Sequence, residues 1–133
     1  MSFPPLEITR PESGNLKLIL HEISHALSEL MATGNERSID LRGIPLAPGE
    51  EKKLLESLGE GEIRAELDAL GKSRIQESRY SGVWIVTHCN SNGEIMGRFI
   101  EITRSPALLA AQTEDMAAGL DALRQLIATG TES

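Results

Sequence analysis

The chain has 133 residues, of which 40% are hydrophobic and 25% charged, values that are ordinary for one globular domain with a single hydrophobic core. Its formal charge of −7 argues against binding to nucleic acid or to an anionic membrane surface, because both need clustered Lys and Arg. Cys89 is the only cysteine, so no internal disulfide can form and we expect a reducing, cytoplasmic compartment. No secretion signal begins the chain and no apolar run approaches the length of a bilayer span, so we expect no membrane insertion.

The chain is expected to begin with an extended arm and to continue as one domain. Residues 1–14 hold three prolines and no sustained period, which predicts an extended N-terminal arm and a single domain over residues 15–133. Residues 15–31 then predict a helix, since their apolar side chains share one stripe at helical spacing. At about 100° per residue, His21 and His25 lie together on the opposite side of this helix.

The middle of the chain predicts short strands and one helix. Residues 37–42 alternate apolar and polar side chains as a strand does, and Pro48-Gly49-Glu50-Glu51 is typical of a helix start, here for residues 49–58. Residues 61–70 fit both a strand and a helix, and we favour a strand because glycines bracket the run. A more polar strand is expected over residues 73–80.

The clearest pattern is a β-hairpin in the second half of the chain. Two β-rich runs, residues 83–89 and 94–103, flank Asn90-Ser91-Asn92-Gly93, and an Asn-Gly pair tolerates the positive φ that mirror-image hairpin turns require. The first run is apolar on both faces, which is typical of a central strand. Trp84 belongs to this run, and the core is its expected place.

Pro106 is expected to open a last helix, over residues 106–128. Its apolar side chains are available for burial against the domain: Leu108, Leu109, Met116, Leu120, Leu123 and Ile127. Together the elements predict an α+β fold, an antiparallel β-sheet of about four to five strands with helices packed on one face.

An H-E-x-x-H motif, residues 21–25, lies on the first predicted helix. In zinc metalloproteases two histidines one turn apart bind the metal and the glutamate acts as base, so His21, His25 and Glu22 could form a zinc site. A catalytic zinc also needs a third protein ligand, and no spacing in the chain singles one out. The alternative is a polar helix face used for recognition, with neither metal nor cofactor.

Asp40, Arg42 and Glu101 are further candidates, each with a structural alternative. Asp40 and Arg42 would share one face of their predicted strand, either as an ion pair or as part of a contact surface. Glu101 stands among apolar residues, so it must lie at the rim of the sheet or be paired, with Arg42, Arg98 or Arg104 as candidate partners.

His88 and Cys89 are neighbours in a predicted strand, so their side chains point to opposite faces and do not form a nucleophilic pair. Cys89 is expected to be a small buried residue. Trp84 is a core residue or an anchor for a partner. Metal or cluster handling would require His88 and Cys89 to converge with the two histidines of the helix.

Five segments, in order and spacing, resemble the C-terminal conserved region of HupH-type hydrogenase expression/formation proteins. The resemblance covers about residues 16–128, and many family members carry a second related region where this chain has one copy. The segments are HEISHAL (21–27), IDLRGIPLAPGE (39–50), GEGE (59–62), SGVWIVTHCN (81–90) and FIEITRSP (99–106).

This resemblance implies a non-enzymatic, chaperone-like factor for the maturation of nickel–iron hydrogenases. Its expected partners are a hydrogenase structural subunit precursor, the small iron–sulfur subunit above all, and other maturation proteins, and a homodimer could form at a sheet edge. No cofactor is expected, and the alternative remains a small zinc-dependent hydrolase. The expected partner surface comprises seven residues: His21, His25, Asp40, Arg42, Trp84, His88 and Glu101.

Overall fold

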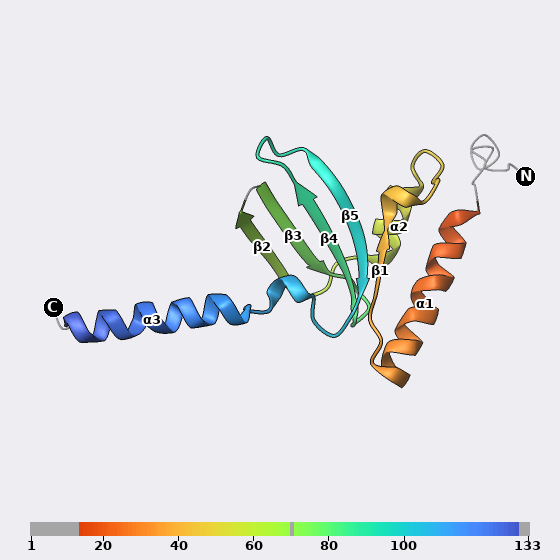
Figure 1. Ribbon diagram of the computed structural model, residues 1–133. Coiled ribbons are helices and arrows are strands. Elements are labelled where there is room, and N and C mark those ends of the chain that lie inside the picture. The colour runs from red at the N-terminus through yellow and green to blue at the C-terminus, as the bar shows by residue number, and fades with distance from the viewer. Residues whose placement is uncertain (1–13, 70, 131–133) are drawn as a thin grey trace, which may run out of the picture.

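The computed structural model describes residues 14–69 and 71–130, so nearly all of the predicted N-terminal arm lies outside the described residues. The elements confirm the predicted α+β fold (Figure 1). In chain order they are α1 (Asn15–Thr33), β1 (Arg37–Asp40), the 3-10 turn η2 (Leu41–Gly43), α2 (Glu50–Leu58), β2 (Arg64–Ala69), β3 (Gly71–Glu77), β4 (Val83–Cys89), β5 (Ile95–Ile102), the 3-10 turn η3 (Ala107–Leu109) and α3 (Thr113–Thr129).

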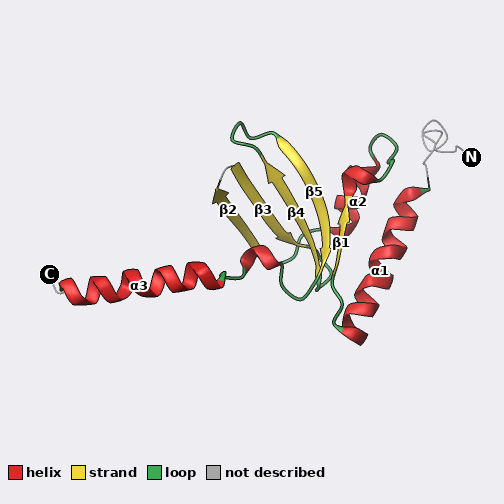
Figure 2. Ribbon diagram, in the orientation of Figure 1, coloured by secondary structure: helices red, strands yellow, loops and turns green. Residues whose placement is uncertain are grey.

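Five antiparallel strands form one sheet in the order β1-β5-β4-β3-β2 (Figure 2). The strands β2 to β5 follow one another as a meander, and β1 joins the sheet at the outer side of β5. The residues at 61–70 that fitted both helix and strand form β2, as predicted. In β4 every side chain is buried except the half-buried His88, as expected for a central strand.

The helices α1 and α2 cover one face of the sheet, which we call the covered face. Gly34 ends α1 with a φ of 82°, and its N–H donates to the carbonyl of Leu30 at 2.8 Å. The core on this side joins three groups of buried side chains: Ile19, Ile23, Ala26 and Leu30 of α1, Leu54 and Leu58 of α2, and Ile39, Val83, Ile85, Ile100 and Ile102 of the strands.

The other face of the sheet carries no helix among the described residues, and we call it the open face. Figure 1 shows α1 and α2 together on the opposite side. The open face has a small apolar cluster of its own, made only of strand residues: Ile75, Trp84 and Val86, with Ala65, Leu67 and Phe99 packed against them. An antiparallel sheet can leave one face uncovered in this way because the other face carries the main core.

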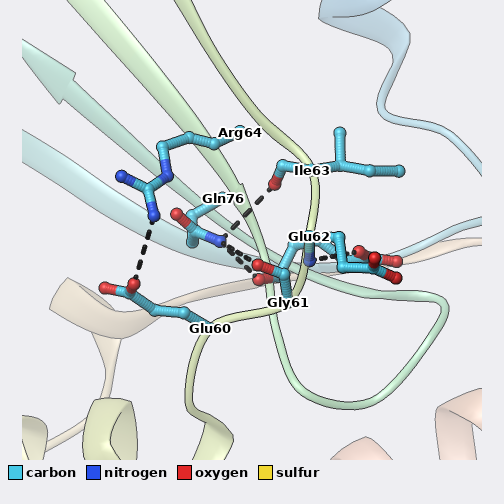
Figure 3. Close-up of polar contacts among 7 residues, drawn as sticks. Glu60, Gly61, Glu62, Ile63, Arg64 and Gln76 are labelled. Carbon is cyan, nitrogen blue, oxygen red and sulfur yellow. Dashed lines mark hydrogen bonds and ion pairs between the residues drawn. The ribbon is translucent and has the colours of Figure 1, made fainter.

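Residues 59–62 link α2 to β2 and are bound by β3 (Figure 3). The Gly61 N–H donates to the Glu77 carbonyl at 2.7 Å, and the Gln76 side-chain amide donates to the carbonyls of Gly61 and Ile63 at 3.5 and 3.4 Å. A Cβ at Gly61 would lie 2.5 Å from the Ser78 carbonyl oxygen. This segment therefore needs glycine because two backbones approach closely there.

The strand predicted over residues 37–42 is shorter in the structure. β1 ends at Asp40, whose carboxylate accepts the N–H of Arg42 at 2.9 Å and so caps the turn η2. The prediction that Asp40 and Arg42 share a strand face is therefore wrong. The Arg42 guanidinium instead donates to the carbonyl of Ile95 at 3.3 Å.

The predicted hairpin is present, but its loop is longer than a two-residue mirror-image turn. β4 ends at Cys89 and β5 begins at Ile95, and within the loop only Gly93 has a positive φ, of 84°. The side-chain oxygen of Asn90 closes the loop by accepting the N–H groups of Asn92 and Glu94, both at 2.9 Å.

The last helix is shorter than predicted, and its predicted burial is wrong. Residues 107–109 form the turn η3, and α3 begins only at Thr113. Pro106 is fully buried, and beyond it the chain leaves the body of the domain, so that α3 extends away from α1 and α2 (Figure 1). No residue of α3 is buried in the described part of the chain. Among the described residues, none of the helices combines the length and apolar character needed to cross a bilayer.

Replacement of Glu50 by alanine is expected to destabilise the fold by about 1–3 kcal/mol, because a partly buried backbone donor loses its acceptor. Gly49 precedes α2 and has no side chain to cap it, and the Glu50 carboxylate, 2% exposed, accepts the Ala47 N–H at 2.6 Å. Urea unfolding checks the change, with Glu50→Gln expected to retain more stability because an acceptor oxygen remains. The exposed Glu56→Ala is the control, and an equal loss in both alanine variants would contradict this role of Glu50.

Candidate functional site

The open face brings four of the seven sequence-predicted residues onto one surface. Directly opposed residues of paired strands point to the same side of a sheet. Trp84 lies opposite Glu101 across β4 and β5, and Asp40 lies opposite Phe99 across β1 and β5. His88 is four residues from Trp84 along β4 and its ring meets that of Phe99 edge-on, with 5.7 Å between the ring centroids. These side chains therefore surround Phe99 on the open face.

Trp84 is the buried support of this surface. Its indole is 4% exposed and its N–H donates to the carbonyl of Thr103 at 3.0 Å. The Thr103 hydroxyl in turn donates to the carboxylate of Glu36, just before β1. The expectation that Trp84 belongs to the core is confirmed, and the indole fixes the backbone at the end of β5 rather than presenting its own surface.

His88 is held in a defined orientation on the open face. Its Nδ1 lies 2.8 Å from the hydroxyl oxygen of Ser73, the residue opposite it on β3. The ring is half-buried against Phe99. One ring nitrogen is thus bound within the sheet, which leaves Nε2 as the atom available to a partner.

Glu101 lies half-buried at the rim, beside Trp84. Burial raises the pKa of its carboxyl above the ordinary value of 4.5, the positive charge of His88 acts in the opposite direction, and the negative charge of Glu36 raises the pKa further. The expected arginine partners do not reach it among the described residues. Arg98, three residues away along β5, points to the covered side, where it pairs with Glu51 at 2.6 Å.

The histidines of the H-E-x-x-H motif lie on the other side of the molecule. His21 and His25 are exposed on the outer surface of α1, away from the sheet that this helix covers. Glu22 forms an ion pair with Arg37 of β1. Within residues 14–69 and 71–130, no group of three or more His, Cys, Asp and Glu side chains is placed to hold a metal ion. Six of the seven predicted residues are thus split between two sides, and the seventh, Arg42, lies in the turn η2 against the start of β5.

Three contributors to the open face escaped the sequence analysis: Ser73, Phe99 and Glu36. Alternation within one strand puts Phe99 on the face of Glu101, but its place opposite Asp40, like that of Ser73 opposite His88, follows only from strand register, which the sequence pattern does not specify across different strands. Glu36 is placed by its contact with Thr103, 67 residues away in the chain. The assembled surface has an apolar centre with carboxylates and one imidazole around it. An apolar centre with a polar rim suits the docking of a polypeptide. Cys89 is buried and presents no accessible thiol.

Glu101→Gln is expected to become more stable relative to the native chain as the pH rises from about 4 to about 7. The raised pKa means that the folded state holds the proton more tightly than the unfolded state. The resulting stabilisation is complete below the ordinary pKa and is lost as the pH rises through the raised pKa. We expect a difference below about 1 kcal/mol for this partly exposed group.

Urea unfolding of both chains at several pH values measures this difference. Glu56→Gln changes an exposed carboxyl of α2 in the same way and serves as the control. Parallel pH profiles for Glu101→Gln and the native chain would contradict the effect of burial.

Comparisons with known proteins agree with this architecture. The chain is 27% identical over 95 residues to the hydrogenase expression/formation protein HoxQ of Azotobacter vinelandii, which covers 71% of this chain and 34% of that protein. The same figures hold for HupQ of Azotobacter chroococcum mcd 1. The chain thus spans about a third of the length of these two relatives.

A solved structure, the hydrogenase expression protein HupH from Thiobacillus denitrificans ATCC 25259, matches with a TM-score of 0.85 and 36% identity, over 90% of this chain and 100% of that one. The family model described as HupH hydrogenase expression protein, C-terminal conserved region, matches residues 14–129. That match includes every described helix and strand. The chain therefore belongs to the family of the HupH hydrogenase expression protein, C-terminal conserved region.

Proposed function

We propose that this chain is a cytoplasmic, non-enzymatic maturation factor for nickel–iron hydrogenase, and that it binds the immature small, iron–sulfur subunit. The observation that carries the proposal is the family match over residues 14–129, supported by relatives named as hydrogenase expression/formation proteins. The chain covers about a third of the length of those relatives, so it is part of the proposal that this third binds the precursor.

The open face is the docking surface in this proposal. The half-buried apolar side chains of the face, Ala65, Leu67 and Phe99, can contact a partner, while the polar groups at its rim orient it. Glu36, Asp40 and Glu101 place three carboxylates near the β1–β5 side of the face. With a chain charge of −7, this surface favours a basic or amphipathic segment of the precursor.

The proposed footprint is narrower than the seven residues predicted from the sequence. Asp40, His88 and Glu101 contact the partner, and Trp84 supports them from beneath. The exposed histidines of α1 lie behind the covered face, too far around the molecule to share this footprint. They supply a second, independent surface for comparison.

Glu101→Lys is expected to reduce capture of the small-subunit precursor about tenfold, equivalent to about 1.4 kcal/mol, because it reverses a half-buried charge at the rim of the footprint. The measurement is affinity capture from cells that are maturing a hydrogenase, followed by identification and quantification of the captured chains by mass spectrometry. Glu29→Lys makes the same charge change on the exposed side of α1 and should capture as much precursor as the native chain.

Two results would count against this proposal in different ways. Equal losses in the two lysine variants would exclude the open face as the specific surface. Capture of no hydrogenase component by the native chain, where another maturation factor captures its own partner, would exclude the proposed function. His21→Ala with His25→Ala tests the second surface, and full capture is expected from that double variant.

A further inference from the structure

The helix α3 presents an apolar stripe that nothing in the described part of the chain covers. Its members recur at intervals of four, three and four residues, the spacing that places side chains in one line along a helix. These four residues, Met116, Leu120, Leu123 and Ile127, are 57%, 47%, 53% and 65% exposed, and we call them the α3 seam.

A helix in this state needs a partner surface. α3 has 17 residues and includes Gly119, and most of the stability of protein helices comes from packing an apolar face rather than from the helix itself. Pro106 is buried where the chain leaves the domain, and α3 projects to the side opposite α1 and α2 (Figure 1). The helix α3 therefore points away from the rest of its own domain.

The domain also carries an apolar groove of about 480 Å³ beside α1, which we call the α1 groove. It is bounded by Leu20, Ser24, Leu27 and Met31 of α1, with Ser57 and Tyr80 on its other side. None of the residues that line it is charged, so an apolar helix can enter without removing a charge from water.

The groove and the seam match in spacing and in length. The α1 positions 20, 24, 27 and 31 repeat the intervals of the α3 positions 116, 120, 123 and 127. The two ends of each row are eleven residue positions apart, or about 17 Å at 1.5 Å per residue. Two rows of equal pitch on two helices interdigitate in side-by-side packing, and serines on the α1 side let the helices approach closely.

We propose that two copies of this chain exchange their α3 helices, each α3 seam lying in the α1 groove of the other copy. The exchange is reciprocal, so it buries both seams and both grooves in one closed, two-fold symmetric dimer. The helix α3 of one copy thus covers the α1 groove of the other copy. This inference does not depend on the proposed hydrogenase partner.

Sedimentation of the 133-residue chain should give twice the 14.5 kDa mass of one copy. Leu120→Asp in the seam and Met31→Asp in the groove each bury a charge at the contact, so each should raise the dissociation constant of the dimer by about tenfold or more. Each variant should then sediment with the mass of one copy. Gln125→Asp, on the opposite side of α3, and Leu18→Asp, exposed on the opposite side of α1, should leave the dimer intact. Circular dichroism establishes that each variant remains folded.

Cross-linking through engineered cysteines identifies which helices meet. Chains with Ser24→Cys are mixed with chains carrying Leu123→Cys or Leu120→Cys under oxidising conditions, and we expect a covalent pair from one of the two mixtures. The native Cys89 is buried, so the unchanged chain should give no covalent pair.

The exchange would be overturned by a native chain that sediments as one copy, by a dimer that survives Leu120→Asp, or by cysteines on α3 that pair only with the same cysteine on another copy. A double variant, Ser24→Cys with Leu123→Cys or Leu120→Cys, that cross-links within one copy would likewise overturn it, since α3 would then fold back on its own body. None of these outcomes bears on capture of a hydrogenase precursor, so the two proposals can fail separately.

Discussion

The packing of β4 and β5 against α1 and α2 is the contact on which the rest of this molecule depends. Val83, Ile85, Ile100 and Ile102 are between 0% and 9% exposed, and each fully buried side chain of this kind contributes about 1.5–3 kcal/mol. The same contact decides where the helices lie, because their buried side chains pack with those of the strands on this face in one core. The outer sides of α1 and α2 and the opposite face of the sheet are consequently left for other uses.

Covering only one face gives the protein two surfaces of different chemistry. The open face combines a small apolar centre with a histidine bound to Ser73 and a carboxylate whose pKa is raised by burial. The α1 side combines exposed histidines with an uncharged apolar groove. A protein that assists the assembly of another needs surfaces that bind a partner without catalysing a reaction. We assign the open face to the hydrogenase precursor and the α1 groove to a second copy.

The projecting helix α3 shows that a periodic pattern can predict a helix correctly while the surface on which the helix packs is predicted wrongly. The apolar stripe of the last helix is visible in the sequence, and in a single copy one expects it to pack on the sheet. The chain instead leaves the body at the buried Pro106 and turns away, so the stripe remains exposed. An apolar stripe shows that a helix has a partner surface, but not to which chain that surface belongs.

The sequence by itself determined the local structure: the stripe of α1, the β4–β5 hairpin, the strand at residues 64–69 and the α+β class all follow from periods of 3.6 and 2 that neighbouring residues set. The five segments that resemble the HupH region likewise needed no coordinates. Only the tertiary structure decided that Asp40, Trp84, His88 and Glu101 share one face, that Arg42 leaves the strand at a cap formed by Asp40, and that Glu22 pairs with Arg37. Strand register and helix placement depend on contacts between distant residues, and a one-residue shift in pairing would move each of those side chains to the other face.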